Sequence, residues 1–176
     1  MNLQDIYTRN CNKQTDINQH LPKLLEYGAK CHTIVEFGVR DGQSTSAFLN
    51  SRPQKMISFD IIKNDAINEL IDAAKNESID FSYRIENSNT ANFETTDLLF
   101  IDSEHTEENT TKELKNAAHK TKKYIIFHDS NYPENPLERS VRMAVDIFLN
   151  EHPEWQIEEE HKNSYGLLIL KKQGIL

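Results

Sequence analysis

The sequence predicts an α/β fold built around a mostly parallel β-sheet. Short runs of β-branched and aromatic residues alternate with longer runs whose apolar residues recur at helical spacing, which is typical of parallel strands joined by crossover helices. Near the C-terminus, two strand-like runs are separated only by a short polar turn around Asn163 and Ser164, so we expect an antiparallel hairpin there. Because both faces of a parallel sheet are normally covered, we expect helices on each side.

Each expected element follows from its own apolar pattern. The strand-like runs, in chain order, are 34–39, 55–60, 79–85, 97–102, 124–127, 155–160 and 167–170. The helical runs are 16–27, 44–50, 65–75, 108–119 and 141–149. We find no internal repeat, low-complexity segment or interdomain linker, so we expect one domain over 1–176, with a helical extension over 1–30 and a ligand-binding core over 31–172.

The composition argues against several classes of partner. A chain of 176 residues with a net charge of −8 lacks the clustered Lys and Arg that neutralise a nucleic-acid backbone. No apolar run approaches the roughly 20 residues that span a bilayer, and residues 1–10 do not have the pattern of a signal peptide. We therefore expect no nucleic-acid or membrane partner and a cytoplasmic location. Cys11 and Cys31 lack metal-ligand spacing and are expected to be reduced thiols.

The segment 34–45 predicts a buried strand, a glycine-bearing turn and the start of a helix. Gly38 and Gly42 let the backbone turn tightly and approach a ligand without a Cβ atom in the way. Ser44 and Thr45 are suited to cap the helix that follows. The chain has neither the lysine of a phosphate-binding loop nor the three spaced glycines of a dinucleotide fingerprint, so the turn predicts a different ligand.

Polar side chains follow four of the expected strands. They are Glu36 to Gly38, Asp60, Asp102 to His105, and His128 with Asp129. In an open parallel sheet, ligands bind beyond the carboxyl ends of the strands, at the point where the strand order reverses. An acidic group there would repel a pyrophosphate but suits a ligand that carries an ammonium group or sugar hydroxyls. We therefore expect the functional site on this rim.

The motifs resemble those of class I S-adenosylmethionine-dependent methyltransferases. The stretches that carry the resemblance are Val35–Thr45, Asp97–His105, Ile125–Asp129 and Tyr165–Leu170, and the similarity extends from about Thr15 to Lys171. Within that superfamily the combination is similar to the small O-methyltransferase branch related to cephalosporin-cluster and macrolide-sugar methyltransferases. The resemblance implies a Rossmann-like sheet of seven strands that ends in an antiparallel hairpin.

The resemblance also implies which residues bind the cofactor, S-adenosyl-L-methionine. Glu36 matches the acidic residue that contacts the methionine ammonium, directly or through water, and Asp60 matches the one that accepts hydrogen bonds from both ribose hydroxyls. The loop Glu86–Ser88 lies where the family places its adenine contacts. The expected cofactor-binding residues are Glu36, Gly38, Val39, Arg40, Gly42, Ser44, Thr45, Asp60, Ile61, Asn87, Ser88 and Asp102.

The expected catalytic set is His105, Asp102 and His128. Asp102 and His105 lie at the end of the fourth expected strand, and His128 follows the fifth. His105 is the candidate base for a hydroxyl acceptor, because Asp102 lies three residues before it and can orient the imidazole. Resembling macrolide-sugar enzymes use this region with a divalent ion, which implies Mg²⁺ on Asp102 and Asp129. His128 stays open as ligand, base or neither.

The sequence favours methyl transfer from S-adenosylmethionine to a hydroxyl of a small molecule or sugar, either with or without the assistance of Mg²⁺. One alternative is a protein that binds S-adenosylmethionine without chemistry, which the bulky Arg40 in the turn would favour. Another is a metal-dependent hydrolase that uses Asp102, His105 and Asp129.

Each of these residues also has a purely structural interpretation. Glu36 could accept hydrogen bonds within its turn, and His105 could be a solvated loop residue. The short chain leaves no dedicated substrate cap, so we expect either the N-terminal helix or the second subunit of a homodimer to complete the pocket. Tyr132, in the proline-containing segment after Asp129, is expected to line or close the acceptor pocket, with an ordinary connecting loop as the alternative.

Overall fold

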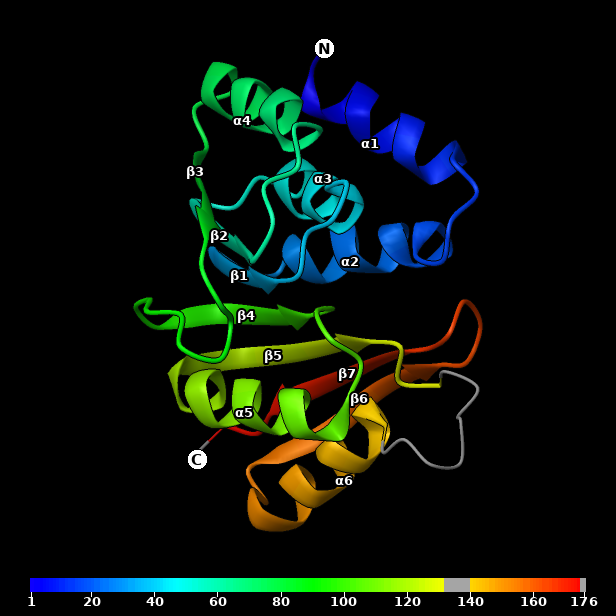
Figure 1. Ribbon diagram of the computed structural model, residues 1–176, viewed down its shortest axis with the longest axis vertical. Coiled ribbons are helices and arrows are strands. Elements are labelled where there is room, and N and C mark those ends of the chain that lie inside the picture. Colours follow the sequence, from blue (N-terminus) through cyan, green and yellow to red (C-terminus); the bar gives the residue numbers. More distant parts are fainter. Residues whose placement is uncertain (132–139, 175–176) are drawn as a thin grey trace.

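In the computed structural model, which describes residues 1–131 and 140–174, the strands form one sheet in the order β3-β2-β1-β4-β5-β7-β6 (Figure 1). The strands are β1 Thr33–Phe37, β2 Lys55–Asp60, β3 Asp80–Ile85, β4 Thr96–Ile101, β5 Thr121–His128, β6 Trp155–His161 and β7 Leu167–Lys172. β1 to β5 run parallel, whereas β7 is antiparallel to both β5 and β6. The predicted mostly parallel sheet with a C-terminal antiparallel hairpin is confirmed.

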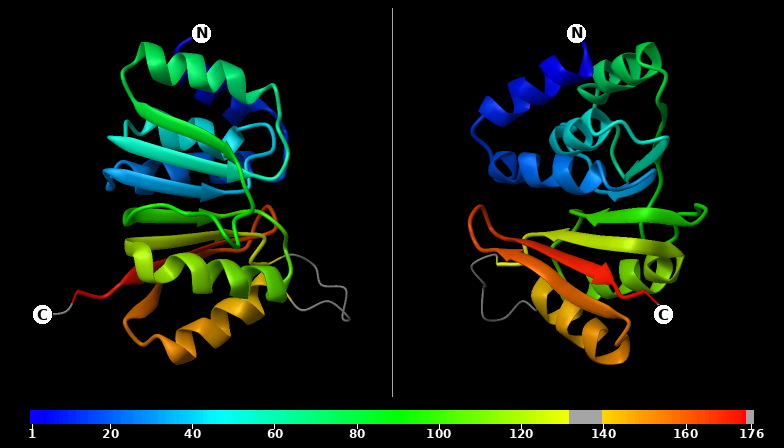
Figure 2. Two further views of the ribbon diagram at one scale, coloured as in Figure 1. Left: turned by 60° about the vertical axis from the view of Figure 1, so that its left-hand side comes forward. Right: turned by 180° about the vertical axis from the view of Figure 1, so that it is seen from behind.

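Helices cover both faces of this sheet, as predicted (Figures 1 and 2). One face carries α1 Leu3–Asn12, α2 Leu21–Gly28, α3 Gln43–Asn50 and α4 Ile67–Asn76. The other face carries α5 Glu107–Ala117 and α6 Val141–Glu151. Two short 3₁₀ turns, η1 Asn18–His20 and η2 Ala118–Lys120, join α2 and β5 to the segments before them. Within the described residues, no helix is long and apolar enough to cross a bilayer.

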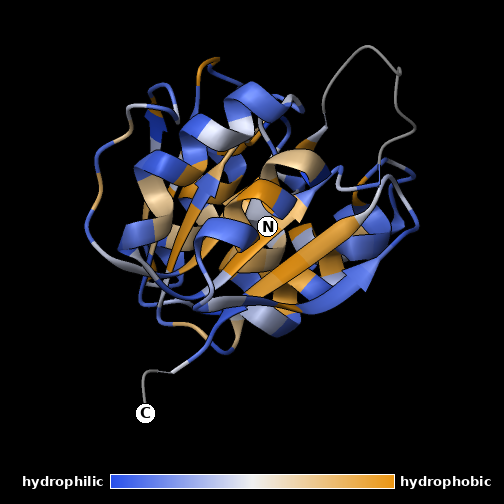
Figure 3. Cartoon of the chain, turned by 90° about the horizontal axis from the view of Figure 1, so that it is seen from below, coloured by the Kyte–Doolittle hydropathy of each residue, from blue (hydrophilic) through white to orange (hydrophobic). Residues whose placement is uncertain are grey.

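The apolar residues of the central strands divide between two cores because successive side chains of a strand point to opposite faces. In β4, which is buried along its whole length, Leu98 and Phe100 pack under α1 to α4, whereas Leu99 and Ile101 pack under α5 and α6. Figure 3 shows these apolar strands enclosed by polar helix and loop surfaces. Truncating a buried aromatic such as Phe100 to Ala should cost about 3–5 kcal/mol of stability.

The N-terminal region differs from the prediction of one helix over 16–27. It contains α1 from Leu3 and α2 from Leu21, joined by a connecting segment and η1. Asn2 caps α1 by accepting a hydrogen bond from the backbone N–H of Asp5, and Pro22 lies in the first turn of α2, where its missing N–H costs nothing. As a result Asp16 lies in the connecting segment and not in a helix.

The strand order reverses between β1 and β4, which lie side by side at the centre of the sheet. Gly38 follows β1 with a φ of 85°, and a Cβ atom on it would lie only 2.0 Å from the carbonyl oxygen of Asp102 after β4. The backbone N–H of Asp102 also donates to the carbonyl of Phe37 at 2.8 Å. The two loops that leave these strands are therefore in direct backbone contact, and position 38 requires glycine.

Candidate active site

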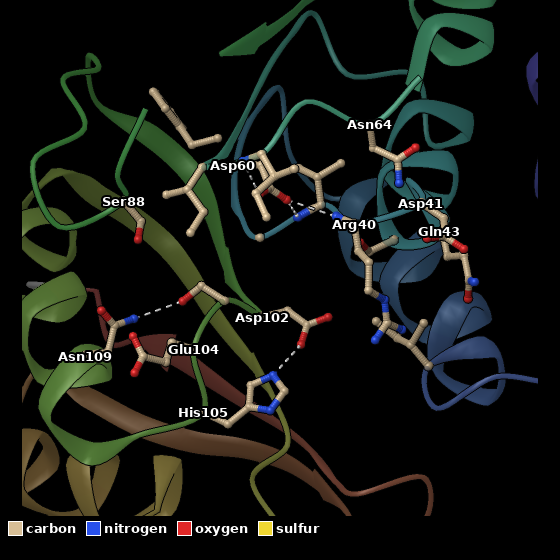
Figure 4. Close-up of a pocket in the computed structure, with 18 of the residues that line it drawn as sticks. Arg40, Asp41, Gln43, Asp60, Asn64, Ser88, Asp102, Glu104, His105 and Asn109 are labelled. Carbon is tan, nitrogen blue, oxygen red and sulfur yellow. Dashed lines mark hydrogen bonds and ion pairs between the residues drawn. The ribbon is translucent and has the colours of Figure 1, made fainter. Parts of the chain in front are cut away.

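A cavity of about 590 Å³ lies at the carboxyl ends of β1, β2 and β4, at the reversal of the strand order (Figure 4). Its volume falls within the range of small-molecule and cofactor sites, which is about 300–1,000 Å³. It is lined by Asp16, Ile17, Gly38, Val39, Arg40, Asp41, Gln43, Ser44, Phe59, Asp60, Ile61, Ile62, Asn64, Glu86, Asn87, Ser88, Asp102, Ser103, Glu104, His105 and Asn109.

Asp60 is placed at the cavity wall by the end of β2. Its Oδ2 accepts hydrogen bonds from the backbone N–H groups of Val39 at 2.9 Å and Arg40 at 3.0 Å, and its Oδ1 accepts one from Ile62 at 3.1 Å. The carboxylate therefore holds the turn after β1, in which Arg40 adopts a φ of 50°. The same side chain lines the cavity between its two ends, as Figure 4 shows.

Glu36 is fully buried and is not among the residues that line the cavity. Hydroxyl groups of Ser44, Thr45 and Ser58 donate to its carboxylate at 2.6, 2.7 and 2.6 Å. Burial raises the pKa of Glu36 to about 7, against the opposing effect of these three donors. Glu36 thus joins β1 to β2 and to the start of α3, and this geometry gives no support to a direct contact between Glu36 and a ligand.

The segment between α1 and α2 forms a charged end of the cavity. Arg40 donates to Asp16 at 2.6 Å, which holds the pKa of that carboxyl below its usual range, and the Thr15 hydroxyl donates to Gln43 at 2.7 Å. These contacts bring Asp16 and Ile17 into the cavity lining. The long side chain of Arg40 therefore reaches the N-terminal segment.

Four titratable residues meet beside the cavity at the ends of β4 and β5. His105 Nε2 lies 2.8 Å from Asp129 Oδ2 and 3.6 Å from Asp102 Oδ1. His128 Nδ1 lies 3.2 Å from Asp102 Oδ1 and 3.0 Å from Asp129 Oδ2. The second ring nitrogen of His128, Nε2, lies 3.1 Å from the backbone carbonyl of Ser164 in the turn between β6 and β7. The predicted grouping of these four side chains is present in the structure.

This arrangement favours the protonated form of both histidines. Hydrogen bonds to Asp102 and Asp129 raise the pKa of His105 to about 9. Burial lowers the pKa of His128, but the same two carboxylates outweigh burial and raise it to about 10. Burial by itself would raise the pKa of Asp129, yet the hydrogen bonds from both histidines hold it well below its usual range. At neutral pH His105 is therefore an imidazolium, which is a proton donor and not yet a base.

Asp102, His128 and Asp129 have the composition and spacing of a divalent-metal site, since one ligand atom from each lies within 4.8 Å of the others. The contact of His128 Nε2 with the Ser164 carbonyl keeps a proton on Nε2, so Nδ1 is the nitrogen that can offer a lone pair to an ion once the ion displaces its proton. The residues therefore fit a metal. Because imidazole nitrogen favours Mn²⁺ or Zn²⁺ over Mg²⁺, the donor set matches the predicted Mg²⁺ less well.

The structure brings most of the predicted site residues together. The predicted cofactor residues that line the cavity are Gly38, Val39, Arg40, Ser44, Asp60, Ile61, Asn87, Ser88 and Asp102. Glu36, Gly42 and Thr45 are not among the lining residues. Of the predicted catalytic and metal-binding residues, Asp102 and His105 line the cavity, whereas His128 and Asp129 lie beside these two residues and outside the lining. Tyr132 lies outside the described residues.

Sequence reasoning assigned no role to several residues of the lining. They include Asp16, Asp41, Gln43, Asn64, Ser103, Glu104 and Asn109. The positions of Ser103 and Glu104 between two candidate residues, directly after the buried strand β4, were the signal that could have found them. Asp16 gave no such signal, because only the folded chain brings it to Arg40.

Solved structures with the same fold include three methyltransferases. The 1,6-didemethyltoxoflavin-N1-methyltransferase from Burkholderia thailandensis is 10% identical with a TM-score of 0.69, over 92% of this chain and 80% of that chain. The N-methyltransferase NodS from Bradyrhizobium japonicum is 12% identical with a TM-score of 0.66, over 99% and 100%. The O-methyltransferase from Bacillus cereus is 13% identical with a TM-score of 0.65, over 97% and 90%.

The chain has the class I methyltransferase fold. All three of these structures contain S-adenosylhomocysteine, and they include both N- and O-methyltransferases. No protein-family model and no curated protein sequence matches this chain. TM-scores of 0.65–0.69 establish a shared fold, whereas identities of 10–13% do not establish a shared chemistry.

Proposed function

We propose that this protein is an S-adenosylmethionine-dependent methyltransferase. The observation that carries the proposal is one cavity, at the reversal of the strand order, that has Asp60 on its wall between the Arg40–Asp16 pair and the loops that carry Ser88 and Ser103. The carboxylate of Asp60 suits the two ribose hydroxyls, and the Arg40–Asp16 pair suits the zwitterionic methionine group. The S-adenosylhomocysteine in the structures of the same fold supports this cofactor.

We further propose that the acceptor is a hydroxyl of a small molecule or sugar. Such an acceptor must lose a proton as it attacks the methyl group, whereas a neutral amine attacks through a lone pair it already has. Asp102 and His105 line the cavity and provide carboxylate and imidazole groups for that proton. As the oxygen–carbon bond forms and the sulfur–carbon bond breaks, the proton passes to the deprotonated form of His105. The raised pKa of His105 makes this form scarce at neutral pH.

The group of Asp102, His128 and Asp129 would hold a divalent ion next to this wall. Such an ion, when bound, supplies positive charge to an acceptor oxygen that is losing its proton. The same group favours a second candidate function, a metal-dependent hydrolase. Metal-dependent turnover of an ester or phosphoester, together with indifference to S-adenosylmethionine, would support that alternative.

Calorimetry with S-adenosylmethionine and S-adenosylhomocysteine tests the proposal on protein stripped of any copurified ligand. We expect micromolar binding by the unaltered protein and a loss of about tenfold or more in Asp60→Ala, because one charge-assisted hydrogen bond contributes about 1.5–3 kcal/mol. Asp72→Ala, which removes an exposed carboxylate of α4 outside the cavity, should bind like the unaltered protein. Absence of binding in the unaltered protein, with and without divalent ions, would contradict the proposal.

His105→Asn separates binding from chemistry. We expect this variant to keep the affinity for S-adenosylhomocysteine and to lose about 10²–10⁴-fold in methyl transfer, which is the usual contribution of a general base. The rate of the unaltered protein should rise between pH 7 and pH 9, because His105 deprotonates only near pH 9. Binding without transfer to any member of a broad hydroxyl panel would favour a cofactor-binding protein without catalysis.

A further inference from the structure

The end of the cavity that Ser88 and Ser103 line is built around Glu113, a residue of α5 that does not itself line the cavity. Glu113 is fully buried, and its Oε1 accepts hydrogen bonds from Ser88 Oγ at 2.6 Å and from Ser103 Oγ at 2.5 Å. Both serines line the cavity, one from the loop after β3 and one from the loop after β4. One oxygen of the Glu113 carboxylate thus accepts a hydrogen bond from a serine hydroxyl of each loop.

This arrangement decides what the two serines can offer to a ligand. A serine hydroxyl has one proton and two lone pairs, so a hydroxyl that donates to a carboxylate presents only lone pairs in other directions. Ser103 uses one lone pair to accept a hydrogen bond from Asn109 Nδ2 at 3.1 Å and keeps the other. The hydroxyls at this end of the cavity are therefore fixed as acceptors, and they match a hydrogen-bond donor on the ligand.

The charges of the cavity indicate which part of the proposed cofactor lies there. A nucleoside whose ribose is held by Asp60 can direct its base toward Arg40 and Asp16 or toward the two serines (Figure 4). The ammonium and carboxylate of the methionine group belong at the end with Arg40 and Asp16, where each finds an opposite charge, whereas the acidic Glu104 beside Ser103 would repel the carboxylate. The neutral, flat base then lies at the serine end of the cavity, whose lining also includes the apolar side chains of Phe59 and Ile61.

We propose that Glu113 is a positioning residue that makes the site select adenine, by turning the hydroxyls of Ser88 and Ser103 into obligate acceptors for the exocyclic amino group. This inference rests on the proposed function. A hypoxanthine base has a carbonyl oxygen in place of that amino group, so its lone pairs would face those of the serines. Sites built around one hydrogen bond reject a ligand that cannot make it, because the buried partner is left unpaired.

Glu113 has a second feature that sets it apart from an ordinary structural anchor. Its Oε2 is buried without a hydrogen-bond partner in residues 1–131 and 140–174. The loop that carries Ser88 is also held independently of Glu113, because Asn116 Nδ2 donates to the carbonyls of Ser88 at 2.8 Å and Ala91 at 3.0 Å. Removal of the carboxylate should therefore leave both serine hydroxyls free to donate a hydrogen bond to a ligand, with the loop that carries Ser88 still in place.

The test compares S-adenosylhomocysteine with its deaminated analogue, S-inosylhomocysteine, by calorimetry at pH 8. Burial raises the pKa of Glu113 to about 7, so at pH 8 the carboxylate is mostly ionised. We expect the unaltered protein to prefer the adenosyl ligand by about tenfold or more. In Glu113→Met, which keeps the approximate volume without the carboxylate, the ratio of the two affinities should fall to within about threefold of unity.

Two further variants make the result specific. Glu108→Met is the matched control, because Glu108 lies on the same helix with a side chain 80% exposed and should keep the ratio of the unaltered protein. Ser88→Ala removes one acceptor directly and should also lower the ratio, which keeps the proposal testable if Glu113→Met fails to fold.

The outcomes separate the inference from the proposed function. If Glu113→Met weakens both ligands equally and keeps their ratio, Glu113 is a structural residue and the inference is wrong, although S-adenosylhomocysteine binds. An unchanged ratio in Ser88→Ala would overturn it as well. If the unaltered protein binds neither ligand, the proposed function fails first and the inference fails with it.

Discussion

Glu36 and Glu113 are both fully buried, accept hydrogen bonds from serine hydroxyls, and lie on opposite faces of the same sheet, yet they use their carboxylates differently. Glu36 uses both oxygens, and three hydroxyl donors hold it between β1, β2 and α3. Glu113 uses one oxygen for two donors. Burial alone therefore does not assign a role to a carboxylate, whereas the number and position of its hydrogen-bond donors do.

The largest expected effect is the loss of the Glu36 carboxylate. Glu36→Ala leaves three buried hydroxyls without their acceptor and opens a cavity, so we expect the free energy of unfolding to fall by about 3–5 kcal/mol. Glu113→Ala, the same substitution at the other site, should cost less free energy of unfolding, because only two hydroxyls lose their acceptor. Both of these hydroxyls belong to half-buried serines, Ser88 and Ser103. Chemical denaturation of the two variants measures the difference, and a greater loss at position 113 would reverse the comparison.

The pH dependence of stability is the next largest effect. The pKa of each carboxyl is about 7 in the folded protein, above the ordinary value of 4.5, so the folded state binds a proton that the unfolded state has released. This contribution to stability is fully present below pH 4.5 and is lost as the pH rises to about 7. Glu113→Met lacks the group, so its stability relative to the unaltered protein should rise between pH 4.5 and pH 7.5 by up to about 3 kcal/mol.

Denaturant titrations at pH 5, 6 and 7.5 check this expectation. The histidines of the site do not contribute to the pH dependence of stability between pH 5 and pH 6. The pKa values of His105 and His128 are about 9 and 10, above an unfolded value of 6.5, so their contribution is complete below pH 6.5 and is lost progressively as the pH rises from there to about 9 and 10. A constant difference between Glu113→Met and the unaltered protein would show that Glu113 has an ordinary pKa.

The smallest effect distinguishes single hydroxyls at the two sites. Ser44→Ala removes one of three donors from a buried carboxylate and should cost about 1 kcal/mol, the usual contribution of one hydrogen bond. Ser88→Ala, in a loop that Asn116 also holds, should cost less than about 0.5 kcal/mol. Equal losses would mean that the two carboxylates depend on their donors in the same way.

Much of this organisation could be predicted from the sequence because the signals were local. The strands and most helices followed from apolar spacing, and Asp60, Asp102 and His105 were found because parallel strands bring their carboxyl ends to one edge. Helix α1 was missed because its apolar residues are few, with Leu3 and Ile6 on the buried face.

Other features depend on contacts that spacing cannot show. A glutamate in the middle of a polar helix predicts an exposed side chain, and nothing next to Glu113 in the sequence reveals that Ser88, 25 residues earlier, covers it. The role of Glu36 was also obscured, since its acceptor capacity is filled by hydroxyls on α3 and β2 that only the fold brings near. In both cases, hydrogen-bond donors from other elements of the fold determine the role of the buried carboxylate.

The strand order also has a consequence for how the chain could be divided. Because the order reverses between β1 and β4, residues up to β3 form one side of the molecule and residues from β4 onward form the other (Figure 1). Asp16, Arg40 and Asp60 reach the cavity from the first side, and Asp102 and His105 from the second. If the chain were cut in the loop between β3 and β4, neither fragment would keep a complete cavity, and a ligand that fills it would favour reassembly of the pair.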